Sequence, residues 1–310
     1  MRAAGVRPNF YKESVKDMYV LQLVLSGLQQ GGVLALLSMG LALMFGVLRV
    51  VNFAQADFMM LGMYGAILMY AAFQLNFAET SLLLVIPAFI VGWLVYELII
   101  RRVAQAKLTS TPEHAQLLAT LGLSLIIQNT AEMVWGATPL NLESSQQLSM
   151  WHIGSLSIDQ PRTIAFGIAI AIGIIMLLVL RGTYIGRAVR AAASDQEAAS
   201  YVGVNVRRVY GATFGVAVAI SVIVGSVLVS YYPATPLAGN DFILLMFTAV
   251  ILGGLGNVMG AMVGGLLLGL IQSLSQLFIP LELNSAVVFV LFLVMMLVRP
   301  SGIFGEVNRL

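Results

Sequence analysis

The chain has 310 residues, of which 59% are hydrophobic and 10% are charged, and its mean hydropathy is +0.94. Soluble globular proteins carry about 25% charged residues, so this composition excludes a soluble globular protein. The absence of cysteine excludes disulfides and thiolate chemistry, and the basic residues do not form a single nucleic-acid-binding stripe. The sequence therefore predicts a polytopic membrane protein.

Apolar runs predict an all-α fold with about eight or nine transmembrane or half-membrane helices. Most runs approach the roughly 20 residues that a helix needs to cross a bilayer, and none alternates as the strands of an outer-membrane barrel do. In chain order the runs are residues 18–47, 58–73, 82–100, 115–135, 164–180, 210–229, 242–252, 258–279 and 286–298. We assign residues 18–299 to a transmembrane domain, residues 1–17 to an N-terminal tail or interfacial helix, and residues 300–310 to a C-terminal tail.

The basic residues predict the orientation of the helices. Of the 16 Lys and Arg residues, three lie at 101–107, five at 181–208 and two at 299–309, which the positive-inside rule places in the cytoplasm. If the runs 18–47 and 58–73 each cross once, the N-terminal tail lies outside; a hairpin within the first run would place it inside. We favour the single crossing, because the Gly31-Gly32 pair is a poor turn in lipid.

A polar break, residues 52–57, separates the first two runs. A carboxylate near mid-membrane costs about 2.5 to 3.5 kcal/mol, so Asp57 must face protein or water and is a candidate functional residue. The alternative is a structural one, in which Asp57 caps the helix 58–73 and pairs with Arg49. We interpret Gln128, Asn129 and Glu132 as a polar cluster at the outer end of the run 115–135.

A second break, the glycine-rich residues 252–257, makes a weak internal pseudo-repeat with the first. In transporters such paired breaks lie near the membrane midplane and frame the translocation path. The residues predicted to line that path are Asn52, Gln55, Asp57, Gly254 and Asn257. Close helix packing is the alternative explanation of the glycines, and four-residue spacings such as Gly260/Gly264 and Gly265/Gly269 are typical of it.

The stretch 183–209 is a polar and basic loop between two apolar runs. Ser194 to Glu197 forms a capping-box pattern that predicts a helix starting at Asp195, and Gly203 predicts its left-handed end. The helix would be about two turns long, with Ala198, Ala199 and Val202 on a smooth face. A knob of this kind can be pushed by a partner outside the membrane; a capped loop helix without a partner is the alternative.

Three motifs resemble those of one transporter family. Glu197-Ala198-Ala199, three residues and then Gly203 are similar to the EAA-x-x-x-G coupling helix of ABC importer permeases. The break resembles the family's Asn-Phe-Ala-His-Gly-Glu motif, with Gln55, Ala56 and Asp57 replacing its last three residues, and 252–256 resembles its Leu-Gly-Gly-x-Gly stretch. Across about residues 27–305 the chain resembles the LivH-type permeases of the branched-chain (hydrophobic) amino acid ABC importers.

The resemblance implies a permease subunit of an importer in the bacterial inner membrane, with branched-chain or other hydrophobic amino acids as substrates. It implies two cytoplasmic ATPases that bind ATP and Mg, a second related permease and an external solute-binding protein, with no cofactor in this chain. The residues that would contact the ATPase are Ser194, Glu197, Ala198, Ala199 and Gly203. Similar permeases carry urea, short amides or aromatic acids, so these substrates stay open.

Other functions are weighed against this one. No Walker motif is present, and the only two histidines, His114 and His152, are predicted at opposite membrane faces and cannot share a metal, so no enzymatic site is expected. A secondary transporter driven by protons through Asp57, Glu97 or Glu132 is the second hypothesis. A structural scaffold is the third, and it does not explain a capped helix in a basic loop.

Overall fold

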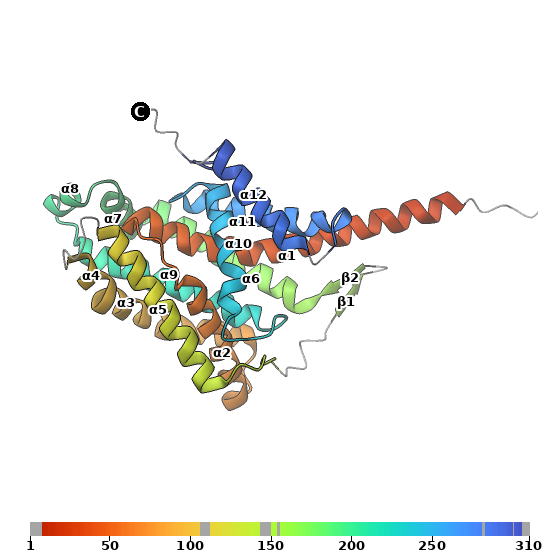
Figure 1. Ribbon diagram of the computed structural model, residues 1–310, viewed down its shortest axis with the longest axis horizontal. Coiled ribbons are helices and arrows are strands. Elements are labelled where there is room, and N and C mark those ends of the chain that lie inside the picture. Colours follow the sequence, from red (N-terminus) through yellow and green to blue (C-terminus); the bar gives the residue numbers. More distant parts are fainter. Residues whose placement is uncertain are drawn as a thin grey trace, which may run out of the picture.

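The computed structural model describes residues 8–105, 112–142, 150–153, 156–280, 283–299 and 301–305. These residues form a bundle of helices that cross one another at different angles (Figure 1). Within them, seven helices are long and apolar enough to cross a membrane, and the shorter apolar helices Ala238–Gly253 and Asn284–Val298 accompany them. The predicted all-α polytopic fold is confirmed.

The elements follow the predicted apolar runs closely. In chain order they are α1 (Pro8–Leu48), α2 (Gln55–Phe73), α3 (Phe77–Val95), the π-helical turn η1 (Tyr96–Ile100), α4 (Arg101–Gln105), α5 (Pro112–Trp135), β1 (Met150–Ile153), β2 (Leu156–Asp159), α6 (Gln160–Gly182), α7 (Tyr184–Ser194), α8 (Gln196–Tyr201), α9 (Val206–Leu228), α10 (Ala238–Gly253), α11 (Val258–Leu274), the 3-10 turn η2 (Ser275–Leu277) and α12 (Asn284–Val298). Both predicted breaks separate helices, at residues 49–54 and 254–257.

A small antiparallel hairpin stands in the predicted outer connection, and the sequence did not reveal it. β1 pairs with β2 in the register Met150↔Asp159 to Ile153↔Leu156. Each strand has only four residues, which is too short for an alternating pattern to stand out from a loop. The hairpin precedes α6, whose first turn is capped by the Asp159 carboxylate.

α1 is one uninterrupted helix of 41 residues, so the hairpin alternative for the first apolar run is wrong. Gly31 lies against the backbone of Leu266, and Gly32 lies against the ring of Phe166, so the glycine pair serves packing and not a turn. The Pro8 end of α1 extends away from the end of the bundle that holds α7 and α8 (Figure 1). Because α1 is one continuous helix, it can cross a membrane only once, and the outside position of the N-terminal tail stays a prediction from the basic residues.

Close contact between small residues holds the central helices together. Gly265 and Gly269 of α11 lie against the backbone of Ala35 and Gly31 in α1, and a Cβ at either position would collide with it. The glycine spacing therefore has the packing role that was predicted for it. α1 and α9 form the centre of the bundle, because 83% and 89% of the residues in their most apolar segments are buried. The corresponding buried share is only 17% to 22% in α3, α5 and α6, which lie at the periphery.

Candidate functional site

The start of the short helix α8 differs by one residue from the prediction. The Asp195 side chain accepts hydrogen bonds from the backbone N–H groups of Glu197 (2.9 Å) and Ala198 (3.0 Å), so Asp195 is the N-cap. Ser194 is the last residue of α7 and does not cap α8. The chain turns at Asp195, which has extended backbone angles and a carboxylate short enough to reach both N–H groups.

The end of α8 is as predicted. Gly203 has a positive φ of +87°, and its N–H donates to the Ser200 carbonyl (3.1 Å), while the Val204 N–H donates to the Ala199 carbonyl (3.0 Å). These two bonds make a Schellman motif, which satisfies carbonyls that a helix end leaves free. α8 is therefore a short helix with a defined cap at each end.

The exposed surface of α8 differs from the predicted smooth face. Ala199 is only 3% exposed and packs against Ala192 of α7 and Val206 of α9, so it anchors the helix and does not lie on its surface. Tyr201 and Val202 are 85% and 78% exposed at its tip. Sequence reasoning missed Tyr201, although its place two residues after Ala199 puts it on the opposite side of a helix.

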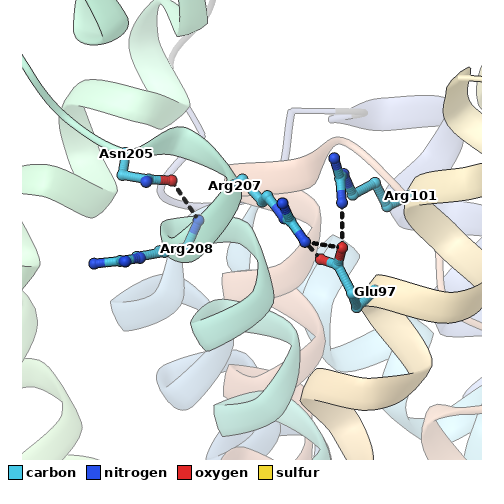
Figure 2. Close-up of polar contacts among 5 residues, drawn as sticks. All are labelled: Glu97, Arg101, Asn205, Arg207 and Arg208. Carbon is cyan, nitrogen blue, oxygen red and sulfur yellow. Dashed lines mark hydrogen bonds and ion pairs between the residues drawn. The ribbon is translucent and has the colours of Figure 1, made fainter.

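The loop is joined to α3 through an ion-pair cluster at the start of α9 (Figure 2). Asn205 caps α9 by accepting the Arg208 N–H at 3.1 Å. Next to it, the Arg207 guanidinium pairs with Glu97 of η1, and Arg101 pairs with the same carboxylate from one turn further along the chain. No local sequence signal predicts this cluster, because Glu97 and Arg207 are 110 positions apart.

The first break brings two of its polar residues together in the interior. Asn52 and Gln55 are fully buried, and the Gln55 amide donates to Ser221 Oγ (2.6 Å) and to the Ala217 carbonyl (3.0 Å) of α9. Gly40 of α1 lies beside the same amide nitrogen, about 12 Å from the Leu48 end of the helix at 1.5 Å per residue. The break therefore lies well inside the membrane-spanning part of the bundle.

Asp57 is buried beside the break, in contact with α5 and α10. It is 1% exposed, and its Oδ1 accepts from Gln128 Nε2 at 2.9 Å, while Oδ2 has no partner among the described residues. Gly239 leaves the room for this carboxylate, since a Cβ there would lie 2.9 Å from Oδ1. α2 begins at Gln55, so Asp57 does not cap it, and no ion pair between Asp57 and Arg49 exists in the described structure.

Polar residues of α5 contact both ends of the first break. Thr120 Oγ1 accepts from the Phe53 N–H (3.4 Å), and Gln128 reaches Asp57 eight residues later on the same side of the helix. Gln128 therefore points inward, and the predicted outer cluster is not formed, because Asn129 and Glu132 are exposed. Residue type alone did not predict which side of α5 faces the other helices.

The second break lies at the basic end of the bundle, where Gly256 and Asn257 line the same cavity as Arg49 and Val51 of the first break. Gly254 has a φ of +108° and lies against Gly305, and Asn257 caps α11 by accepting the Gly260 N–H at 2.9 Å. The Asn257 amide also donates to the Phe304 carbonyl at 3.0 Å, which ties the break to the chain after α12. The structure thus brings Asn52 and Gln55 together, places Asp57 beside α5 and α10, and ties Asn257 to the chain after α12.

Comparison with known proteins decides the family. A family model described as the permease component of a branched-chain amino acid transport system matches residues 23–296. The chain belongs to this permease family. The sequence-based resemblance is confirmed, and the chain is a multi-pass transport protein of the inner (plasma) membrane.

Two relatives illustrate the match. The permease is 31% identical over 302 residues to the high-affinity branched-chain amino acid transport system permease protein LivH of Salmonella typhimurium, with 94% of this chain and 98% of that one covered. It is 26% identical over 296 residues to BraD of Pseudomonas aeruginosa, covering 93% and 96%. The solved structure of PsaBC from Streptococcus pneumoniae in complex with Fab aligns with 96% of this chain and 98% of that one, at 14% identity and a TM-score of 0.48.

The three acids considered for a proton pathway lie apart in this permease. Glu97 is paired with two arginines at the cytoplasmic end, Asp57 is buried beside α5, and Glu132 is exposed on α5. In the described part of the chain, no hydrogen bond links any two of them. The described side chains thus form no direct hydrogen-bonded chain between these three acids.

Proposed function

We propose that this permease is the membrane-spanning subunit of an ABC importer and moves branched-chain or other hydrophobic amino acids into the cell. The observation that carries the proposal is α8, a helix capped at both ends that presents Tyr201 and Val202 to the cytoplasm in a chain related to LivH and BraD. ATP and Mg would bind to two partner ATPases, and this chain would have no enzymatic activity or cofactor. An external binding protein would deliver the solute.

The proposed coupling surface consists of Glu197, Ala198 and Gly203 with the exposed Tyr201 and Val202, and Ser194 and the buried Ala199 support it. An ATPase that binds α8 would move this helix as a small rigid body, because the caps at Asp195 and Gly203 stabilise both of its ends. Ala199 packs on Val206, so the force would pass directly into α9.

α9 offers a route from the cytoplasm to the first break. It is the most buried of the candidate spans, and its Ala217 and Ser221 hold the Gln55 amide. A shift of α9 along its axis would therefore move the residues around Asn52, Gln55 and Asp57. We propose that these residues line the path, together with Gly254 and Asn257 nearer the cytoplasm, and that a second related permease completes the pore.

Transport in reconstituted vesicles tests the proposal. The permease is incorporated with its ATPases, second permease and binding protein, and leucine uptake and ATP hydrolysis are measured together. Glu197→Arg and Gly203→Val are expected to abolish most uptake while the assembly still inserts. Ile185→Ala is the matched control, because Ile185 is exposed on the same loop but lies on α7. Normal uptake by the Glu197→Arg/Gly203→Val double variant would refute the coupling role of α8.

The same vesicles separate the alternative functions. A proton-driven carrier would lose uptake when an uncoupler is added in the presence of ATP, whereas the proposed importer would keep it. Gln55, Ala56 and Asp57 replace the family's His-Gly-Glu, so the identity of the solute is tested directly. Competition of labelled leucine with urea, short amides and aromatic acids identifies which class is carried.

A further inference from the structure

A cavity at the cytoplasmic end of the permease combines three arginines with an apolar wall. Its volume is about 850 Å³, and it lies among the ends of α1, α6 and α7 and the turn before α11. Arg49, Arg181 and Arg190 line it, and none of its lining residues in the described structure is Asp or Glu. The neighbouring cluster in Figure 2 differs, because there the Glu97 carboxylate pairs with both Arg101 and Arg207.

Among the described residues these three arginines have no ion pair, and the hydrogen bonds of two of them go to uncharged groups. Arg190 donates to the Leu180 carbonyl, and Arg181 Nη2 donates to Met259 Sδ at 2.8 Å. Both acceptors are neutral. A guanidinium prefers a planar anionic acceptor such as a phosphate or carboxylate, with which it forms paired, charge-assisted hydrogen bonds. The cavity therefore has the electrostatics of an anion site.

The apolar side of the cavity excludes a small soluble anion as its best ligand. The apolar wall includes Leu177, Leu180 and Val258. Leu255 and Met259 extend this wall to the surface of the protein, where their side chains are 45% and 46% exposed. Arg181 lies in the last turn of α6, and the positive-inside rule puts arginines at such a helix end near the cytoplasmic headgroups. A zwitterionic amino acid fits less well, since its ammonium group would find no acid in the described lining.

We propose that this cavity binds an anionic phospholipid of the inner leaflet, with its phosphate on the arginines and an acyl chain on the leucine-rich wall. Basic pockets between membrane helices on the cytoplasmic side are the known form of such sites. The lipid would bridge α1, α6 and α7, next to the loop that carries α8. This inference holds whichever solute the permease carries.

Native mass spectrometry of the purified full-length chain tests the site. The protein in detergent is titrated with dioleoylphosphatidylglycerol and, separately, with dioleoylphosphatidylcholine. The wild type is expected to prefer the anionic lipid, and each removed arginine is expected to weaken its binding roughly fivefold. Arg49→Gln combined with Arg181→Gln should therefore abolish most of the preference, with phosphatidylcholine binding unchanged as evidence of folding.

The controls separate this site from general attraction and from soluble phosphate. Arg208→Gln removes an exposed arginine of the same face that points away from the Glu97 cluster and does not line the cavity; it should bind like the wild type. The single variant Arg181→Gln changes only an exposed side chain, so it should fold even if the double variant does not. It is expected to show the fivefold loss of lipid binding. An unchanged lipid preference in Arg181→Gln, an equal loss in Arg208→Gln, or displacement of the lipid by equimolar glycerol phosphate would each overturn the proposal.

Discussion

Glu97 and Arg207 join two helices at the point where the cytoplasmic loop enters the membrane. Arg207 Nε donates to Glu97 Oε2 at 3.1 Å, and Arg207 Nη2 donates to the other carboxylate oxygen, so the contact is bidentate (Figure 2). Arg207 is the second residue of α9, which is the next helix after α8 in the chain. Glu97 lies in the π-helical turn that follows α3. Such turns often occur at functional positions, and this one links the loop to a peripheral helix.

Removing the Glu97 charge should weaken coupling more than folding. Glu97→Gln leaves Arg101 and Arg207 facing each other without a carboxylate, so the start of α9 should separate from α3. We expect leucine uptake per ATP hydrolysed to fall by roughly twofold to thirtyfold, which corresponds to the about 0.5 to 2 kcal/mol typical of residues that link two sites. Uptake and hydrolysis are measured in the same vesicles.

Exchange of the two charges tests whether the pair itself matters. Glu97→Arg with Arg207→Glu restores an ion pair across the same helices, and it should recover part of the uptake that either single change removes. If the exchanged protein is no better than the single variants, the effect of Glu97→Gln does not come from this pair.

Asp195, and not Ser194, should determine the stability of α8. Asp195→Ala removes the acceptor of two N–H groups and should destabilise the helix by about 1 kcal/mol. Ser194→Ala should have little effect, and Asp195→Asn keeps an oxygen acceptor and should lie between them. Hydrogen exchange of the α8 amides measures the difference, and faster exchange in Ser194→Ala than in Asp195→Ala would contradict the assigned cap.

Gly225 should tolerate no side chain, because α9 contacts α2 through it. A Cβ at Gly225 would collide with the Met59 carbonyl, so Gly225→Ala is expected to lower stability by about 1 to 3 kcal/mol. Gly167 of α6 has open space around it, and Gly167→Ala is the matched control, with stability unchanged or slightly raised. Thermal unfolding of the purified proteins in one detergent compares them.

Asp57 should matter as a hydrogen-bond acceptor even without its charge. Asp57→Asn can keep the bond from Gln128, whereas Asp57→Leu removes it and should cost about 1 kcal/mol, because the half-buried Gln128 amide keeps Ser124 and Asn240 as acceptors. We expect Asp57→Asn to melt near the wild type and Asp57→Leu clearly below it. Equal melting temperatures for the two variants would show that the Gln128 contact contributes nothing.

Local features of the chain were predictable because they depend on neighbouring residues. Hydropathy gave the spans and their order, and Gly203 ended α8 where a positive φ was expected. The cap of α8 was misassigned by one residue, since Ser194 and Asp195 are both good caps and only the actual turn of the chain distinguishes them. The four-residue hairpin strands gave too little pattern to be seen.

Composition and hydropathy by themselves determined that this is a multi-pass helical membrane protein, and its motifs indicated the permease family. The tertiary structure alone decided which distant side chains meet: Glu97 with Arg207, Asp57 with Gln128, and the arginines around one cavity. It also brought residues of both breaks to that cavity, which Val51 and Asn257 line. The reason is physical, because a span is a sum over adjacent residues, whereas a contact between helices depends on the rotation and depth of each helix, which packing of the whole bundle determines.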